Sequence, residues 1–420
     1  ELFIKKIEEE SLQELLYTIE MPLIPLLYKS QNYGIKIDEK TLIEQTEKIK
    51  REQENIYNTI LQYTDPFKEH FSTYGFNPLS MKQVSLLLYD LLGLQGIFKT
   101  EKNKEFSTDQ QSLNALKNKH PVVGLIAEYR TLSSYLSRYA TNFNKYIHNG
   151  RISTHFQQTH VITGRISTID PNLQNIPRNT EAFSIRSAFV ADDGYDFVSF
   201  DYSQIELRVL AYMSQDQRLL EAFLHNEDIH TLTAAEIFNA SLENVSKDQR
   251  QIAKKINFSI VYGLSSFSLA HDLGISQEQA KEYFTQYKKT YYGVFSWIEK
   301  IEKELSKTLY VKTLYGRKRY FYELHKAKEK AHTKRAAINT IIQGTAADII
   351  KKAILALDPL LASYNAHMIL QIHDEIIIQV PTKSTKEVIE KGKIIMEQIV
   401  STWNIPLVVN TAQGNNWGKL

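Results

Sequence analysis

The stretch MILQIHDEIIIQVP, residues 368–381, places three ionisable side chains between two apolar runs. The runs Met368–Ile372 and Ile376–Val380 have the length and the β-branched content of strands. They predict a β-hairpin whose tip holds His373, Asp374 and Glu375. An isolated hairpin turn favours Asn-Gly or Asp-Gly, so turn chemistry does not account for two adjacent acids. The pair therefore indicates a chemical role at the end of a buried hairpin.

The overall composition is that of an ordinary globular protein. The 420 residues are enough for two or three domains, and 43% are hydrophobic and 23% charged. The formal net charge of +2 arises from 50 basic and 48 acidic residues, so a polyanion site requires local clusters of Lys and Arg. The absence of cysteine excludes disulfides, thiolate zinc sites and cysteine nucleophiles, and it is compatible with a reducing compartment.

Neither a membrane span nor a targeting segment is expected. No apolar run approaches the roughly 18 residues that a transmembrane helix needs. The chain opens with ELFIKKIEEE, which has no initiator Met and no signal-peptide pattern. We therefore expect a mature product or a fragment of a longer protein, without membrane association.

The pattern along the chain predicts an α+β fold. Helical periodicity dominates residues 7–63 and 112–146, and Ser80 with Gln83 fits a capping box that opens another helix. From Arg151 the chain alternates like strands, and Phe197–Phe200 reads as a strand that continues directly into a helix. Helices are expected over 217–357 and from Thr385 to about Trp403. The order predicts an antiparallel sheet, interrupted by one helical insertion and preceded by a helical domain.

Two carboxylates are candidates for a metal site. Asp201 ends the strand DFVSFD, and Asp374 lies at the hairpin tip. If both strands share a sheet, the two acids repel each other unless a divalent cation lies between them. Two cations about 3.5–4 Å apart would suit in-line phosphoryl transfer. The alternative is that Asp201 caps a strand end and Asp374 is a turn residue.

A second candidate is the helix RQIAKKINFSIVYG. Arg250, Lys254, Phe258 and Tyr262 recur every four residues and lie along one helix face, about 6 Å apart. A triphosphate along this face would meet the two cations while its base stacks on Phe258, and His230 could add a phosphate contact. The alternative is a plain amphipathic helix with solvated cations, although Ile256, Ile260 and Val261 already supply an apolar face.

Side-chain amides form a third group. TGRISTIDPNLQNIP supplies Arg165, Asn172, Gln174 and Asn175, and AAINTIIQGTAAD places Asn339 and Gln343 at i and i+4. Amides and Arg can bind the minor-groove acceptors that all base pairs share, whereas caps and turns are the ordinary alternative for such residues. The lysine-rich segment FKTEKNKEFSTD has no periodicity and is expected to be a loop.

Taken together, the motifs resemble those of the family A DNA polymerases, the bacterial DNA polymerase I type. DYSQIELR, RQIAKKINFSIVYG and QIHDE look like the three signature motifs of that family. TGRISTIDPNLQNIP, YGRKRY, QGTAAD, FNPLSMKQVSLLLYDLLGL, KTEKNKEFSTD and GNNW also match it in order. The resemblance covers nearly the whole chain. It implies a right-hand polymerase fold with an antiparallel palm sheet and largely helical thumb and fingers: thumb 1–145, palm 146–215 and 356–420, and fingers 216–355.

The resemblance also implies roles for individual residues. Two Mg²⁺ ions, for which Mn²⁺ could substitute, would bind Asp201, Asp374 and the carbonyl of Tyr202, while Glu375 and His373 would hold the primer end. Glu206 would obstruct a 2′-hydroxyl and so select deoxynucleotides. The incoming dNTP would contact Gln204, Glu206, His230, Arg250, Lys254, Phe258 and Tyr262. Primer-template DNA would contact Arg165, Asn172, Gln174, Asn175, Asn339, Gln343, Arg130 and a thumb tip with Lys99, Lys102 and Lys104.

Three positions depart from the family pattern: Ser259 where Gly is usual, Gln251 where a second Arg is frequent, and Ser134 where Lys is expected. None is a metal ligand, so the departures bear on nucleotide affinity and template grip. The family's proofreading and 5′-nuclease domains have no counterpart in this sequence, so we expect neither exonuclease activity from it. We also expect a monomer in the bacterial cytoplasm or in an organelle of bacterial descent.

The function expected from the resemblance is template-directed DNA synthesis with release of pyrophosphate. One alternative is a primer-template binding module without catalysis, although such copies would be expected to lose an acid and both are present. Another is a single-subunit RNA polymerase-like enzyme, against which Glu206 argues because a ribonucleotide needs room at its sugar.

Overall fold

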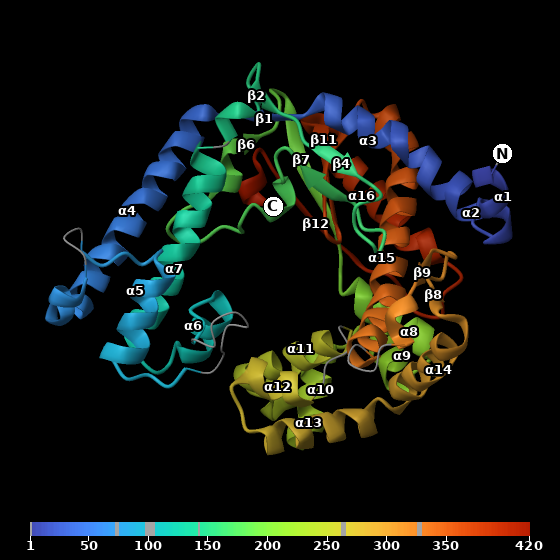
Figure 1. Ribbon diagram of the computed structural model, residues 1–420. Coiled ribbons are helices and arrows are strands. Elements are labelled where there is room, and N and C mark those ends of the chain that lie inside the picture. The colour runs from blue at the N-terminus through green and yellow to red at the C-terminus, as the bar shows by residue number, and fades with distance from the viewer. Residues whose placement is uncertain (1, 72–74, 97–105, 142, 262–265, 326–329) are drawn as a thin grey trace. The chain divides into compact units, whose positions relative to one another are not determined.

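The computed structural model describes residues 2–71, 75–96, 106–141, 143–261, 266–325 and 330–420 (Figure 1). The chain forms two compact units. The first contains Glu1–Ile35, Ser153–Asn175 and Ala191–Leu420, and the second contains Lys36–Ile152 and Ile176–Val190. Helices and antiparallel strands occur together in this fold, which confirms the α+β prediction.

The second unit is mainly helical, and side-chain acceptors cap the starts of its α-helices at Asp38, Ser80, Asp109 and His120. Ser80 accepts a hydrogen bond from the Gln83 N–H at 3.3 Å, but the Gln83 side chain accepts from the Asn77 N–H at 2.6 Å, so the predicted capping box is only half formed. A sheet with the strand order β2-β3-β1-β6 accompanies the helices. The elements are β1 (Ile35–Ile37), α4 (Glu39–Thr64), α5 (Met81–Ser85), α6 (Gln110–Leu116), α7 (Pro121–Tyr135), β2 (Ile147–His148), β3 (Arg151–Ile152) and β6 (Phe189–Val190).

The first unit contains the main sheet, in the order β10-β11-β7-β12 (Figure 1). The hairpin prediction is confirmed by β10 (His367–Ile372) and β11 (Glu375–Pro381), and the strand prediction by β7 (Tyr195–Tyr202). β7 pairs antiparallel with β11 on one side and with β12 (Val409–Gly414) on the other. The sequence did not indicate β12, because its exposed side chains are polar and lack apolar alternation.

Helices pack against this sheet and fill the remainder of the first unit. The expected closing helix is α16 (Thr385–Glu397), which contacts β7, β11 and β12. It lies so close to β7 that a Cβ at Gly392 would come within 2.7 Å of the Phe200 ring. The other helices are α1 (Leu2–Glu9), α2 (Gln13–Leu15), α3 (Met21–Tyr33), α8 (Ile205–Ser214), α9 (Gln217–Leu224), α10 (Ile229–Phe238), α11 (Lys247–Val261), α12 (Ser266–Leu273), α13 (Gln277–Thr290), α14 (Tyr292–Thr308) and α15 (Lys330–Ser363).

Two small hairpins complete the unit. β4 (His155–Gln157) pairs with β5 (Ser167–Ile169), in the region where the sequence predicted strands. β8 (Tyr310–Lys312) pairs with β9 (Lys318–Tyr320), inside a region where only helices were expected. The turn of this second hairpin contains Gly316 with φ +86°, a conformation that glycine adopts without strain.

A buried ionic network attaches the β8–β9 turn and the N-terminal segment to α15. The Arg317 guanidinium donates to Asp348 Oδ1 at 2.6 and 3.0 Å and also pairs with Glu20. Lys351, 1% exposed, donates to Glu20 at 2.7 Å, and the Thr313 hydroxyl donates to Asp348 Oδ2 at 2.7 Å. Burial raises the pKa of Asp348 and lowers that of Lys351. Each buried charge therefore depends on its partners.

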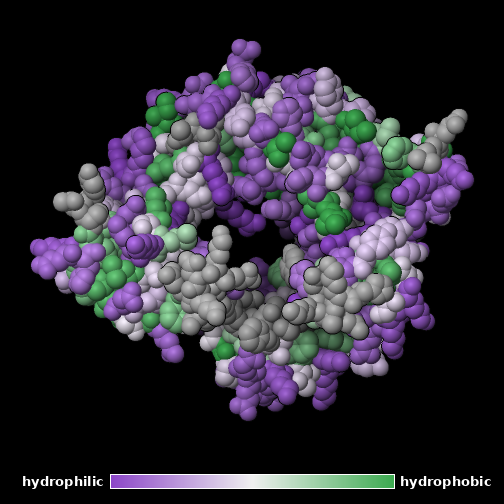
Figure 2. Space-filling view, viewed as in Figure 1, coloured by the Kyte–Doolittle hydropathy of each residue, from purple (hydrophilic) through white to green (hydrophobic). Residues whose placement is uncertain are grey.

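The surface contrasts with this interior. The face shown in Figure 2 is mostly hydrophilic, and its hydrophobic areas are small and separated. Among the described residues, no helix is both long enough and apolar enough to cross a membrane.

We predict that Arg317→Met lowers the free energy of unfolding by about 3–5 kcal/mol, because it leaves the buried carboxylate of Asp348 without its guanidinium partner. Urea denaturation would measure the loss. Lys391→Met breaks an ion pair whose partners are 51% and 54% exposed, and it serves as the matched control, expected to show little change. Equal effects of the two substitutions would contradict the assignment of Arg317 to a buried network.

Candidate active site

Strand pairing brings Asp201 and Asp374 to the same end of the main sheet. Asp201 is the next-to-last residue of β7, and Asp374 lies in the two-residue turn before β11. The Tyr202 N–H donates to the Asp374 carbonyl at 3.1 Å. His373, the other turn residue, has φ +52°, in the left-handed region that His tolerates better than most residues. Both acids therefore lie at the same end of the sheet, and their role as metal ligands stays a prediction.

Glu375 adds a third acid beside this pair. It is the direct cross-strand partner of Asp201, and residues directly opposite each other project from the same face of a sheet. The Ser199 hydroxyl, two residues before Asp201, donates a hydrogen bond to Glu375 Oε1. Like charges that face each other across two strands destabilise the pairing. A cation at this end of the sheet would offset that repulsion.

The surroundings of the Asp374 carboxyl also favour a cation at this end of the sheet. Its side chain is 28% exposed, and Oδ1 has no hydrogen-bond partner within the structure. Burial raises the pKa of Asp374 to about 7, with Glu206 and Asp201 adding to the rise and Arg165 opposing it. The carboxyl is therefore partly protonated near neutral pH in the protein alone, and a cation would favour its charged form.

Arg165 links Asp374 to Glu206. Its Nη2 lies 2.7 Å from Glu206 Oε1 and 3.8 Å from Asp374 Oδ1, while its Nε is buried without a hydrogen-bond partner. The Glu206 side chain, in the first turn of α8, is 6% exposed. The half-buried Gln204 precedes α8 with φ +53°. Arg165 therefore compensates two acids at once.

The donor set fits hard divalent cations. Carboxylates and a backbone carbonyl are oxygen ligands, which Mg²⁺ and Mn²⁺ prefer. Within the described part of the chain, no group of three or more His, Asp or Glu side chains is arranged to hold a metal ion by itself. The pair Asp201 and Asp374 would thus leave coordination positions for the Tyr202 carbonyl, water and substrate oxygens.

The cationic helix face lies on α11. Arg250 Nε donates to Asp228 Oδ2 at 2.6 Å, and Lys254, one turn later, is exposed. Burial raises the pKa of Asp228, but hydrogen bonds from Arg250, Thr231 and the His230 N–H outweigh it and hold the pKa at about 2. Phe258 is half-buried, with its ring centroid 5.7 Å from that of His230. Tyr262 lies outside the described residues.

His230 is deeply buried, at 3% exposure. Burial lowers its pKa to about 4, and Arg250 and Lys254 reinforce the effect while Asp228 opposes it. Its Nδ1 lies 3.0 Å from the Asn257 side-chain nitrogen. His230 is therefore a neutral group at physiological pH.

Several predicted DNA contacts already have partners inside the protein. Gln174 Nε2 donates to the carbonyls of Ile166 and Gln371 at 3.1 and 2.9 Å. Asn172 Oδ1 accepts from the Gln174 N–H at 3.0 Å, and Gln343 Oε1 accepts from the Thr163 hydroxyl at 2.8 Å. These contacts give both glutamines and Asn172 a local structural role. Their contacts with a duplex stay predictions.

Other members of this group differ in their surroundings. The Asn339 side-chain nitrogen is buried and has no hydrogen-bond partner, so it could donate to a ligand. Asn175 is exposed. In the second unit, the Arg130 guanidinium donates to the carbonyls of Pro78 and Thr108, and burial lowers its pKa. Lys99, Lys102 and Lys104 lie outside the described residues.

The three departures from the family pattern have ordinary surroundings. The Ser259 hydroxyl donates to the Lys255 carbonyl at 2.5 Å, one turn back in its own helix. Gln251 is exposed and Ser134 is half-buried.

Two residues beside the site were missed by the sequence reasoning. Ser199, which holds Glu375, has its partner 176 residues away, so no local signal marks it. Asn257 could have been found, because it places an amide beside Ala253 and Ile256 on the buried face of α11.

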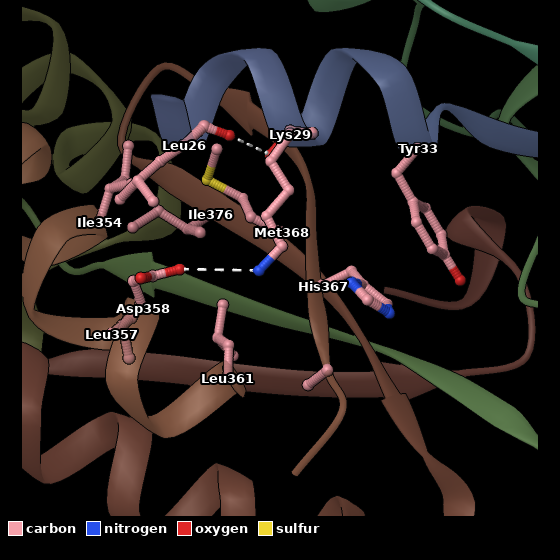
Figure 3. Close-up of a pocket in the computed structure, with 12 residues that line it drawn as sticks. Leu26, Lys29, Tyr33, Ile354, Leu357, Asp358, Leu361, His367, Met368 and Ile376 are labelled. Carbon is pink, nitrogen blue, oxygen red and sulfur yellow. Dashed lines mark hydrogen bonds and ion pairs between the residues drawn. The ribbon is translucent and has the colours of Figure 1, made fainter. Parts of the chain in front are cut away.

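A separate cavity lies at the start of β10 (Figure 3). Lys29 pairs with Asp358 at 4.0 Å beside it, and Tyr33 stacks on His367 at 4.2 Å. Its lining contains none of the predicted site residues. It is not part of the candidate site.

The family model for DNA polymerase family A matches residues 39–419, so the chain belongs to DNA polymerase family A. It is 38% identical to the DNA polymerase I of Pseudomonas aeruginosa, over 97% of this chain and 45% of that protein. It is 37% identical to the thermostable DNA polymerase I of Thermus aquaticus, over 97% of this chain and 49% of that protein. The chain thus spans about half the length of the curated relatives it matches.

A solved structure agrees with this assignment. The POL domain of Pol1 from M. smegmatis, in complex with DNA primer-template and dNTP, superimposes with a TM-score of 0.91 at 31% sequence identity. The match covers 99% of this chain and 73% of that one. The right-hand polymerase fold expected from the motifs is confirmed.

We predict that Asp374→Asn raises the melting temperature in EDTA at pH 8.5 by a few degrees and has little effect at pH 4. The folded-state pKa of about 7 lies above the ordinary value of 3.8, so the folded protein binds the proton more tightly than the unfolded chain. Stability is then fully present below the unfolded pKa and falls as the pH rises through 7. Thermal melts across this range would measure the difference.

The exposed carboxylate of Asp358, 38% exposed, provides the control for that measurement. Asp358→Asn should leave the pH profile close to that of the unsubstituted chain. Adding Mg²⁺ should stabilise the unsubstituted chain more than Asp374→Asn. If the melting temperatures of the unsubstituted chain and Asp374→Asn changed with pH in parallel, the raised pKa assigned to the Asp374 carboxyl would be contradicted.

Proposed function

We propose that this chain is a template-directed DNA polymerase that adds deoxynucleotides to a primer 3′ end and releases pyrophosphate. The observation that carries the proposal is the convergence of Asp201, Asp374 and Glu375 at one end of the β7–β11 pair. The relatives named DNA polymerase I, and the related POL domain bound to primer-template and dNTP, support it.

Asp201, Asp374 and the Tyr202 carbonyl would hold two Mg²⁺ ions, or Mn²⁺ in their place. Bound there, the metals would activate the primer hydroxyl and neutralise charge on the phosphates. The protein's own residues prepare this site. The Arg165 guanidinium compensates the negative charges of Glu206 and Asp374 before substrate binds. The Ser199 hydroxyl holds the Glu375 carboxylate beside the proposed site of the primer end. His373, the first residue after β10, would lie at the same place.

The triphosphate would lie along α11. Arg250 and Lys254 would contact its oxygens as cations and His230 as a neutral donor, while Phe258 would stack on sugar and base and Tyr262 would close the templating position. Gln204 and Glu206, at the start of α8, would face the sugar. The 2.7 Å pair with Arg165 supports this role, because it holds Glu206 in one place and so keeps the obstruction to a 2′-hydroxyl rigid.

The duplex would contact Arg165, Asn339 and Gln343 from α15 and its neighbourhood, with Asn172, Gln174 and Asn175 beside them. Lys99, Lys102, Lys104 and Arg130 would bind phosphates from the thumb. The proposed division is thumb 1–145, palm 146–215 and 356–420, and fingers 216–355. We also propose that the protein acts as a monomer. The bacterial relatives favour a bacterial cytoplasm, or an organelle of bacterial descent, as its location.

We predict that Asp201→Ala and Asp374→Asn each reduce primer extension with Mg²⁺ by about 10³-fold or more, because both remove a metal ligand. Glu375→Gln keeps the shape and loses the charge, so it should cost about tenfold. Gel-resolved extension of a labelled primer would measure the rates. Primer-template affinity should stay close to that of the unsubstituted chain in all three variants.

The same experiment separates the alternatives. A binding module without catalysis would bind primer-template tightly and show no extension by the unsubstituted chain. Retained extension in both aspartate variants would overturn the assignment of the metal ligands.

We predict that Glu206→Ala increases ribonucleotide incorporation and also slows extension with dNTPs. The first effect follows from room at the sugar, and the second from releasing Arg165, which then has only Asp374 as its acidic neighbour among the ion pairs of the described residues. Glu206→Gln retains an acceptor for Arg165 and a similar volume, so it should stay selective. Single-nucleotide incorporation of dATP and ATP opposite thymine would measure the ratio. Equal use of dATP and ATP by the unsubstituted chain would favour the RNA polymerase-like alternative.

A further inference from the structure

A buried polar network joins α10 to α11 beside the proposed nucleotide site. Thr233 and Asn257 are 0% exposed, and His230 is 3% exposed. His230 and Thr233 lie on α10, and Asn257 directly precedes Phe258 on α11. Tyr291, at the junction of α13 and α14, reaches the same cluster with its hydroxyl. Buried polar atoms of this kind have to satisfy one another.

The hydrogens of this network can be assigned from its acceptors. The Thr233 hydroxyl lies nearer to the Ile229 carbonyl, at 2.7 Å, than to Asn257 Oδ1, and because both oxygens can only accept, its single hydrogen points to the nearer one. None is left for Asn257 Oδ1, 3.1 Å away. Thr233 Oγ1 therefore accepts from the Tyr291 hydroxyl at 2.7 Å and from Asn257 Nδ2 at 3.0 Å. Both of its lone pairs are then used.

This assignment fixes the tautomer of His230. The second hydrogen of Asn257 Nδ2 points to His230 Nδ1, 3.0 Å away. An amide nitrogen cannot accept a hydrogen bond, so Nδ1 carries no hydrogen and the neutral ring holds its proton on Nε2. The charged groups near the ring are Asp228, Arg250 and Lys254, and burial with the two cations keeps the imidazole neutral at physiological pH.

We infer that Asn257 is a positioning residue, which holds His230 as the Nε2–H tautomer and so supplies a neutral donor for a triphosphate oxygen between Arg250 and Lys254. The inference rests on the proposed function. A charged imidazolium in the same place would add a third positive charge and retain the pyrophosphate product. A neutral donor recognises the phosphate oxygen without that extra attraction.

The tautomer can be tested without any activity measurement. In the 420-residue chain labelled with ¹⁵N-histidine, the signals of His230 would be assigned by their loss in His230→Gln. From pH 6 to 8 we expect an unprotonated Nδ1 and a protonated Nε2. Asn257→Asp keeps the shape but can only accept, so Nδ1 should become protonated. Tyr291→Phe removes a hydroxyl from the same network without touching His230 and should leave its signals unchanged.

The positioning role is tested by nucleotide binding. dATP would be titrated into each variant bound to a primer-template with a dideoxy-terminated primer and a templating thymine. At each pH, the dATP dissociation constant of a variant is divided by that of the unsubstituted chain. For Asn257→Asp this ratio should differ by about fivefold between pH 6 and pH 8, whereas for Tyr291→Phe it should stay constant.

The outcomes are separable. A protonated Nδ1 or a charged His230 in the unsubstituted chain at pH 7 would overturn the tautomer assignment. A correct tautomer with a constant dATP ratio for Asn257→Asp would overturn the positioning role. Failure of every variant to bind dATP, with the expected ¹⁵N signals, would instead count against the proposed function and leave the tautomer assignment supported.

Discussion

The pairing of β7 with β11 is the interaction on which the site depends. Its register sets Glu375 opposite Asp201 and brings the Asp374 carbonyl to the Tyr202 N–H. Five consecutive residues of β11 are buried, so a shift by one residue would move apolar side chains to the other face. The packing of the strand interiors thus holds together acids that would separate on electrostatic grounds alone.

Two clusters of acids in the first unit differ in how their charge is compensated. Glu20 and Asp348 face Arg317 and Lys351, each within hydrogen-bonding distance, so that cluster balances itself. At the sheet end, Arg165 bonds to Glu206 but stays 3.8 Å from Asp374, whose Oδ1 lacks a hydrogen bond. The first arrangement is that of a structural network. The second leaves negative charge for an external cation, as a metal-dependent site requires.

Features that a short stretch of sequence marks could be predicted, whereas contacts between residues far apart in the sequence could not. The hairpin, β7 and the cationic face of α11 could be predicted because each shows the residue periodicity of a strand or a helix within a single segment. β12 was missed because an edge strand with polar side chains has no such period. The contact of Gln174 with Gln371 spans 197 residues, and that of Ser199 with Glu375 spans 176, so a single sequence carries no pattern that pairs them. The sequence motifs therefore identify the acids of the site, whereas the contacts that position them are visible only in the folded structure.

The two faces of α11 extend this reasoning to the nucleotide. Arg250 bonds to Asp228, just before α10, and Asn257 bonds to His230 on α10, so both contacts reach the same neighbouring segment. They lie nearly two helical turns apart, and a rotation of α11 about its axis would break both. Any movement that carries Arg250 and Lys254 toward a triphosphate while keeping these contacts has to carry α10 and His230 with it. The neutral donor and the two cations would then reach the phosphates together.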